Sequence, residues 1–127
     1  MKEIIWTDEF SVGVAKLDEQ HKKIIGLINK LIHEQSLSID SEIFEDALSE
    51  MLKYSGQHLR YEERLLAENN YPDFEKHEKC HEEYMEKVGG FSISALNADD
   101  RVPKDVIEYL KNWWEQHILH EDMKYKS

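Results

Sequence analysis

Histidine is frequent in this chain, and most of its histidines fall where a helix would place a hydrophobic residue. The sequence has 7 histidines among 127 residues. Five of them share stripes with apolar residues at the spacing of one helix face: His21, His58, His77, His81 and His117. Because a polar group that leaves water needs a partner, this pattern indicates imidazoles that meet inside the fold.

Two of these histidines are followed by a second potential ligand one helical turn later. Glu62 follows His58 by four residues, and His81 follows His77 by four. Side chains at this spacing lie one above the other on the same face of a helix. A single buried histidine is more often a hydrogen-bonded core residue, and either pair alone also fits a helix-stabilising contact. The convergence of both pairs with the other stripe histidines favours a metal site.

The residue types restrict which metals would fit. Imidazole and carboxylate without thiolate suit iron, zinc or manganese. The candidate ligands number more than four, which is too many for the tetrahedral shell of a single zinc ion, so we expect two metal ions. The di-iron arrangement of ferritin-like proteins needs repeated Glu-x-x-His motifs, whereas this chain has such a motif only at Glu78 and His81. The sequence therefore does not fit the ferritin template.

The elements that must position these residues are helices. Glycine and proline number only 5 and 2, which is sparse for an all-β fold with a turn every 8–12 residues or so. The apolar period predicts helices at about 18–36, 41–68, 72–88 or on to 96, and 103–120, after a non-helical arm at residues 1–17. Asp18 is the expected N-cap of the first helix, and Gly89 with Gly90 leaves the end of the third open. Residues 1–127 are thus expected to form a single all-α domain, an up-down-up-down four-helix bundle.

Composition excludes several classes of function. The chain has 27 acidic and 16 basic residues, a formal net charge of −11, which repels nucleic acid and anionic membrane surfaces. It has no apolar run of about 18 residues that could span a bilayer. Acidic residues occur near the N-terminus where an export signal would be apolar, so we expect no such signal. The single Cys80 cannot close an intramolecular disulfide. We therefore expect a cytoplasmic protein and, because the core uses the apolar stripes, a monomer.

The order of the candidate ligands resembles the hemerythrin family, in particular its bacterial single-domain members. The matching residues are His21, His58, Glu62, His77, His81, His117 and, five residues after His117, Asp122. The likeness extends to Trp6 in the arm, the Leu17–His21 segment at the start of the first helix, Tyr71-Pro72 before the third, and Trp113 four residues before His117. It covers nearly the whole chain, and a pattern with these separations is highly specific.

This resemblance implies a centre of two iron ions joined by an oxo or hydroxo bridge. Glu62 and Asp122 would bridge both irons, His77, His81 and His117 would complete one, and His21 with His58 would bind the other. These ligands fill all but one position of two six-coordinate ions, so dioxygen would bind at the iron with two histidines. On an ideal helix Glu121, rather than Asp122, shares the face of His117. The resemblance therefore requires the helix to unwind or end there, and Glu121 is the alternative ligand.

The implied function is reversible binding of dioxygen, for carriage, storage or delivery, rather than an enzymatic reaction. Reversibility needs a dry pocket, because water and protons promote loss of reduced oxygen and leave ferric iron. The apolar stripes supply a wall, which is bundle core in either case: Ile24, Ile25, Ile28, Leu59, Trp113, Trp114 and Ile118. Trp114 stands where relatives usually have Leu or Phe. The alternatives are a di-iron oxidoreductase, which handles peroxide or nitric oxide or oxidises ferrous iron, and an iron store or sensor.

Overall fold

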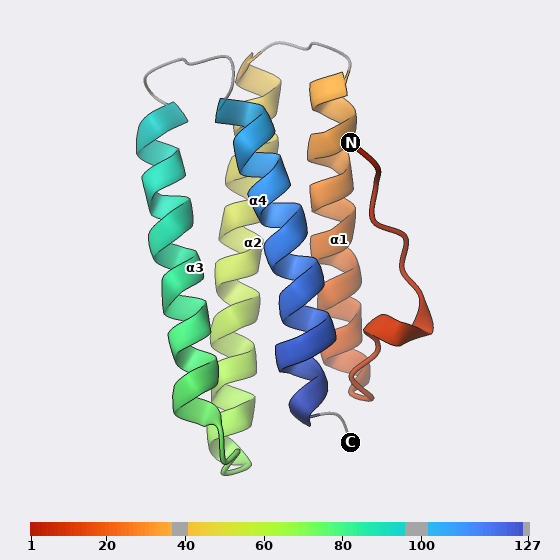
Figure 1. Cartoon of the computed structure of the whole chain (residues 1–127), viewed down its shortest axis with the longest axis vertical. Coiled ribbons are helices and arrows are strands. Elements are labelled where there is room, and N and C mark those ends of the chain that lie inside the picture. The colour runs from red at the N-terminus through yellow and green to blue at the C-terminus, as the bar shows by residue number, and fades with distance from the viewer. Residues whose placement is uncertain (37–40, 96–101, 126–127) are drawn as a thin grey trace.

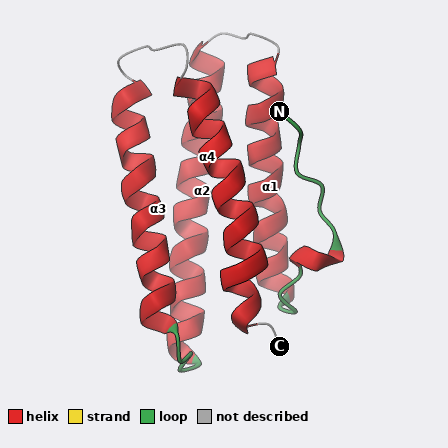
Figure 2. Cartoon of the chain, viewed as in Figure 1, coloured by secondary structure: helices red, strands yellow, loops and turns green. Residues whose placement is uncertain are grey.

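The chain folds into a bundle of four helices that run alternately up and down, as the computed structural model in Figure 1 shows. It describes residues 1–36, 41–95 and 102–125. The helices are α1 (Ala15–Ser36), α2 (Ser41–Glu68), α3 (Phe74–Ala95) and α4 (Val102–Gln116). Helices α2 and α4 each pack against both α1 and α3. The prediction of an all-α four-helix bundle is therefore confirmed (Figure 2).

Several limits of the helices differ from the expected ones, since α3 begins at Phe74 rather than at 72 and α4 ends at Gln116 rather than at 120. Helix α1 begins at Ala15, so Asp18 lies within its first turn and is not the N-cap. The Asp18 carboxylate instead accepts hydrogen bonds from the Val12 backbone N–H at 2.8 Å and the Ser11 hydroxyl at 2.6 Å, which ties the arm to α1. Helix α3 continues through its paired glycines to Ala95. Each glycine costs about 1 kcal/mol relative to alanine in a helix, and tertiary packing of the apolar face offsets such costs.

A tight turn after α2 reverses the chain. Asn70 has a φ of 53°, a left-handed conformation that asparagine tolerates better than most residues. The backbone N–H groups of Asn70 and Tyr71 donate to the carbonyls of Ala67 and Leu66, at 3.2 and 3.0 Å. These two bonds form a Schellman motif, which satisfies carbonyls at the end of the helix. The turn sets the first turns of α3 beside the last turns of α2, where both helices carry candidate ligands.

The N-terminal arm lies along the outside of α1 (Figure 1). The Ile4 backbone N–H donates to Asn29 Oδ1 at 2.8 Å, and Asn29 Nδ2 donates to the Ile4 carbonyl at 2.9 Å. Trp6 stacks on Phe10 with ring centroids 5.5 Å apart. Phe10 closes a short 3-10 turn, η1 (Asp8–Phe10), so the arm is not wholly non-helical. Hydrogen bonds and aromatic packing therefore hold the arm against the bundle.

The interior of the bundle, in the part of the chain that the structure describes, is mainly apolar. Its fully buried hydrophobic side chains include Ile24, Ile28, Met51, Leu110 and Ile118. The same interior buries polar side chains, each no more than 4% exposed: His21, Ser55, His58, Glu62, His77, His81, His117 and Asp122. Among helices in the described ranges, none combines the length and the apolar composition that crossing a membrane requires. The buried histidines and carboxylates among these polar side chains form the candidate functional site.

Candidate metal centre

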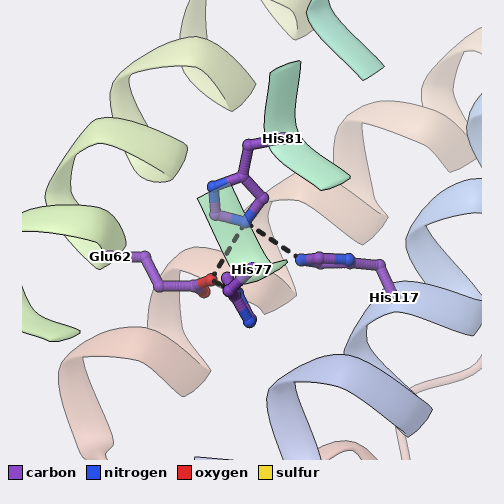
Figure 3. A group of neighbouring side chains, drawn as sticks. All are labelled: Glu62, His77, His81 and His117. Atoms are coloured by element: carbon purple, nitrogen blue, oxygen red, sulfur yellow. Dashed lines mark hydrogen bonds and ion pairs between the residues drawn. The ribbon is translucent and has the colours of Figure 1, made fainter. Parts of the chain in front are cut away.

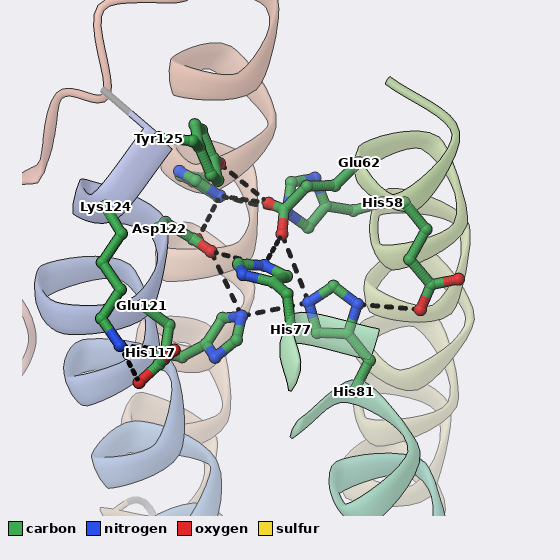
Figure 4. Close-up of polar contacts among 11 residues, drawn as sticks. His58, Glu62, His77, His81, His117, Glu121, Asp122, Lys124 and Tyr125 are labelled. Carbon is green, nitrogen blue, oxygen red and sulfur yellow. Dashed lines mark hydrogen bonds and ion pairs between the residues drawn. The ribbon is translucent and has the colours of Figure 1, made fainter. Parts of the chain in front are cut away.

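Three helices and the turn after α4 direct histidines into one buried cluster, whose polar contacts Figure 4 shows. His21 comes from α1, His58 from α2, His77 and His81 from α3, and His117 from a π-helical turn after α4, η2 (His117–Glu121). Each of the five points its Nε2 atom toward a side-chain oxygen of Glu62 or Asp122. The structure thus brings together all seven residues of the predicted ligand set.

Three histidines gather around Glu62 and form the three-histidine group, which consists of His77, His81 and His117 (Figure 3). One donor atom from each of them and from Glu62 lies within 4.8 Å of the others. Glu62 Oε1 is 2.5 Å from His77 Nε2 and 3.2 Å from His81 Nε2. Asp122 Oδ1 is 3.1 Å from His77 Nε2 and 3.2 Å from His117 Nε2. One oxygen of each carboxylate therefore serves this group.

The remaining pair, His21 and His58, forms the two-histidine group on the other side. Their donor atoms and that of Glu62 also lie within 4.8 Å of one another. Glu62 Oε2 is 3.7 Å from His21 Nε2 and 3.4 Å from His58 Nε2. Asp122 Oδ2 is 3.3 Å from His21 Nε2. Each carboxylate thus directs one oxygen to each group, which is the geometry that a ligand bridging two ions needs.

The charge and the unpaired atoms of the cluster fit bound cations. Glu62 and Asp122 are completely buried, and an ionised carboxylate without a compensating charge is costly in such a place. Within the described part of the chain, both oxygens of Asp122 lie at ion-pair distance from imidazoles but form no hydrogen bond, and Nδ1 of His21 and of His77 has no hydrogen-bond partner. Imidazole nitrogens and carboxylate oxygens without a thiolate are a donor set for iron, zinc or manganese. The residues present therefore fit a site for two metal ions.

Without metal, the carboxylates favour protonation of the imidazoles nearest to them. Burial by itself lowers the pKa of His21 and of His77, but the contacts with Asp122 and Glu62 outweigh it and raise each pKa to about 9. At His58 burial prevails and lowers the pKa. Burial alone would raise the pKa of both carboxyl groups, but the surrounding imidazoles hold them below their usual range. Protons and metal ions therefore compete for the same buried anionic site.

The metal-free chain should lose stability as the pH rises from about 6.5 to about 9. His21 and His77 have a pKa of about 9 in the folded chain, against about 6.5 for an unfolded histidine. A raised pKa stabilises the fold fully below the unfolded value, and this contribution is lost as the pH rises through the folded value. The melting temperature of chelator-treated protein should fall across this range. His21→Gln should flatten the profile, and an equally steep fall in that variant would contradict the assignment.

A π-helical turn explains why Asp122 reaches the cluster. The backbone N–H of Asp122 donates to the carbonyl of His117, five residues earlier, as in a π-helix. A 3-10 turn, η3 (Asp122–Tyr125), follows. Asp122 is completely buried, whereas Glu121 lies outside the cluster and pairs with Lys124 at 3.2 Å (Figure 4). The helix thus widens by one residue rather than ending, and the alternative ligand Glu121 is not brought to the site.

The two neighbouring acids should respond differently to substitution. Asp122→Asn removes a carboxylate that faces both histidine groups, so metal affinity should fall by more than the roughly 10–100-fold loss typical of residues that only support a ligand. Glu121→Gln breaks an exposed pair with Lys124 and should leave the metal content unchanged. Metal content per chain, measured after anaerobic loading and desalting, checks both. Loss of metal from Glu121→Gln but not from Asp122→Asn would reverse the assignment.

Gln20 and Glu63 support the cluster, although the sequence pattern did not single them out. The Nδ1–H of His58 donates to Gln20 Oε1 at 2.6 Å, and that of His81 donates to Glu63 Oε1 at 2.9 Å. A partner on the outer nitrogen fixes the ring and leaves Nε2 free to bind a metal. Each polar partner sits directly beside a ligand in the sequence, next to His21 or Glu62. That adjacency is the signal that could have found them.

Tyr125 of η3 also supports the cluster without having been predicted. Its hydroxyl donates to Glu62 Oε2 at 3.0 Å (Figure 4). Its ring packs against His77 and Tyr71, with centroids 5.9 and 6.1 Å apart. Apolar periodicity does not reveal this residue, because the short 3-10 turn after Asp122 brings it inward. An aromatic residue one turn after a candidate ligand is the only sequence signal for it.

The residues expected to line a dry pocket do not all lie in one place. Six of them are no more than 4% exposed and belong to the hydrophobic core: Ile24, Ile25, Ile28, Leu59, Trp114 and Ile118. Trp114 faces His58, with ring centroids 5.8 Å apart. Trp113 is only partly buried and stacks on His117, at 4.3 Å and an interplanar angle of 13°. The structure therefore places Trp113 on the three-histidine side rather than in the expected wall.

A chain of hydrogen bonds holds Trp114 in place. Its indole Nε1–H donates to the Tyr84 hydroxyl at 3.2 Å. The Ser55 hydroxyl donates to the Leu52 carbonyl at 3.1 Å and lies 3.0 Å from the Tyr84 hydroxyl. Because the serine hydrogen is already used, Tyr84 donates to Ser55. Burial raises the pKa of Tyr84 to about 12, so all the hydrogens of this chain stay committed near neutral pH.

Known proteins resemble this chain over nearly its full length. The family model described as the hemerythrin HHE cation binding domain matches residues 12–127. A bacteriohemerythrin of Clostridium acetobutylicum is 28% identical over 125 residues, which cover 95% of this chain and 97% of that protein. A hemerythrin-like protein of Naegleria gruberi is 33% identical over 122 residues, or 96% and 90% of the two chains. The crystal structure of a leucine-to-alanine mutant of hemerythrin matches with a TM-score of 0.87 at 24% identity, over 99% of this chain and 96% of that one.

Proposed function

The chain belongs to the hemerythrin family, and from this premise we propose that it binds dioxygen reversibly at a centre of two iron ions. The observation that carries the proposal is the unequal division of the histidines. Three imidazoles face one side of Glu62 and two face the other, while both carboxylates face both sides. The two-histidine side therefore has one protein ligand fewer, which leaves room there for a small external ligand.

The residues of the chain would hold the centre and keep its surroundings dry. His21, His58, His77, His81, His117, Glu62 and Asp122 would hold the metal. When bound, a pair of ferrous ions supplies two electrons and the open coordination position for dioxygen. Ile24 and Ile25 lie one helical turn after His21 and are no more than 4% exposed. These side chains exclude water from the two-histidine side, which favours release of dioxygen over its reduction, because reduction consumes protons.

The hydrogen-bond chain at Trp114 supports the same role. Trp114, Tyr84 and Ser55 are completely buried, and their polar hydrogens run in one direction toward the Leu52 carbonyl. None of these hydrogens is available to protonate a ligand beside His58. The large indole also fills space against that histidine. Trp114 thus contributes bulk without contributing an acid, which suits carriage, storage or delivery of dioxygen.

Anaerobic loading with ferrous iron, followed by air, tests the proposal. We expect two irons per chain and a visible absorption band that appears with air, disappears under vacuum and returns with air. A vibrational band that shifts with isotopically labelled dioxygen should accompany it. Irreversible oxidation with turnover of peroxide, nitric oxide or ferrous iron would instead identify an oxidoreductase. More than two irons per chain, or iron that exchanges freely, would identify a store.

A further inference from the structure

A surface groove borders the candidate metal centre at His117, a member of the three-histidine group. It has a volume of about 520 Å³ and lies between α3 and the C-terminal part of α4 with η2. The residues that matter in its lining are Cys80, Glu83, Tyr109, Trp113, His117 and Glu121. Among the five ligand histidines of the described chain, only His117 lines this groove, and at 4% it is also the most exposed of them. The roles proposed above, holding metal and keeping water from the two-histidine side, do not account for this groove.

Stacked aromatic rings connect the groove to His117. Trp113 lies nearly parallel to the His117 ring, at 4.3 Å between centroids and 13° between planes. Trp113 also stacks on Tyr84, at 4.3 Å between centroids and 29° between planes. Tyr84 in turn lies parallel to Tyr109, at 6.4 Å and 9°. Trp113 is partly exposed, so a molecule in the groove could touch a ring that is in direct contact with a ligand of the three-histidine group.

We propose that Trp113 is the residue through which the oxidised metal centre receives electrons from a reductant that docks in this groove. The inference rests on the proposed iron centre and adds a use for its three-histidine group. Any reversible carrier of dioxygen that loses its ferrous state must regain it. Passing electrons through His117 lets this happen without opening the dry wall at the two-histidine group. Water and reductant are thereby kept away from the dioxygen side.

The balance of the step is simple. Two molecules of a one-electron reductant each lose one electron, and the two ferric ions each gain one. The electrons cross the stacked rings of Trp113 and His117, so no bond to either side chain forms or breaks. Protons needed by oxygen atoms at the centre come from solvent. Trp113 is therefore a positioning residue for electron transfer, and it is unchanged at the end.

The charge of the groove indicates what kind of reductant fits. The described residues that line it include the carboxylates of Glu83 and Glu121 and no lysine or arginine. Two lysines lie at its rim, because Lys124 pairs with Glu121 at 3.2 Å and the Lys87 ammonium lies 5.9 Å from the centroid of Tyr109, whereas Glu83 is exposed. The chain as a whole carries a formal charge of −11. A small electron-transfer protein with a basic face around its redox group therefore fits, because opposite charge steers such partners together.

Reduction kinetics of the oxidised, iron-loaded protein test the role of Trp113. The probe is hexaammineruthenium(II), a cationic one-electron reductant, and iron content is measured for every variant. Trp113→Leu should slow the reduction several-fold, whereas Trp113→Phe, which keeps a ring against His117, should restore most of the rate. Equal rates in all three proteins would overturn the proposal. Because dioxygen binding is followed separately, an intact air-dependent band with unchanged reduction rates would reject this inference alone.

Substitution of the charged rim tests the place of contact. Glu83→Gln should lower the rate with the cationic probe and weaken its dependence on ionic strength. The matched control is Glu68→Gln, an exposed glutamate at the end of α2, which should leave both unchanged. If Glu68→Gln has the same effect as Glu83→Gln, only the net charge matters and the groove is not the contact site.

Tryptophan fluorescence of the metal-free protein provides a measurement that does not depend on iron. Trp113 is partly buried beside acidic residues, Trp114 is completely buried, and Trp6 lies under the Lys22 ammonium at 5.0 Å. Caesium should therefore quench mainly Trp113, whereas iodide should favour Trp6. Trp113→Phe should remove the fraction quenched by caesium. If that fraction survives the substitution, the groove does not admit cations to Trp113 and the proposal fails.

Discussion

Replacement of Glu62 by glutamine should cost the protein its ability to hold two metal ions. Glu62 is the residue that the three-histidine and two-histidine groups share, and it is completely buried. The amide preserves the volume of the side chain but removes the charge that offsets the cations. A ligand that binds only the folded chain stabilises it by about 2.7 kcal/mol at a concentration 100 times its dissociation constant. Glu62→Gln should lose most of this stabilisation by iron, because neither ion keeps its full set of ligands.

Metal content and thermal unfolding measured with and without ferrous iron check this result. The matched control is Glu63→Gln, a change of the same kind at the next residue. Glu63 accepts a hydrogen bond from His81 Nδ1 but does not face the metal side, so this variant should weaken binding by about 10–100-fold and still take up two irons when iron is saturating. Two tightly held irons in Glu62→Gln would show that the shared carboxylate is not a bridge.

Trp114→Ala should be the most destabilising substitution in the apolar wall and should also change the response to dioxygen. Trp114 is completely buried, and truncation of a buried tryptophan to alanine costs about 3–5 kcal/mol. For a chain of this size, such a loss lowers the melting temperature by roughly 10 °C or more. The cavity would lie against His58, and it would leave the Tyr84 hydroxyl without its donor. We expect two irons per chain, faster dioxygen binding and faster irreversible oxidation.

Two further variants separate bulk from hydrogen bonding in this prediction. Trp114→Phe keeps a ring but lacks the indole N–H, whereas Tyr84→Phe keeps Trp114 and removes its acceptor. If bulk controls access to the two-histidine side, only Trp114→Ala should bind dioxygen faster in stopped-flow measurements. If the fixed orientation of the indole matters, Tyr84→Phe should share the effect. Loss of iron from Trp114→Ala would show that the residue supports the centre structurally rather than controlling access.

The sequence predicted the bundle well because its information is periodic. Stripes of apolar residues reveal which face of each helix points inward, and the same periodicity showed that His58 with Glu62 and His77 with His81 point to the same interior. The limits of the helices were harder to predict. Glycines at 89 and 90 disfavour a helix locally, yet α3 continues through them to Ala95. Likewise, Asp18 has the chemistry of an N-cap and serves instead as an acceptor for the arm.

The site was predictable as far as helical spacing and family resemblance extend. Helix geometry alone selected Glu121, and only the resemblance pointed to Asp122, which the structure places beside the histidines. Residues that act through contacts between different helices left no periodic signal. Gln20 reaches His58 across a helix pair. The apolar stripe of the last helix predicted that Trp113 points inward, but not which histidine group it contacts. That contact depends on how α4 is rotated against α3.

Because of the π-helical turn, the register of the backbone determines which of two adjacent acids, Glu121 or Asp122, faces the histidines. In regular α-helical register Glu121 would face inward, and in the wider register Asp122 does. Deleting one residue between His117 and Asp122 should therefore keep this aspartate on the inner face in a regular α-helix, because it would then follow His117 by four residues. Searches for related centres in other proteins should accordingly allow the final carboxylate an offset of either four or five from the last histidine.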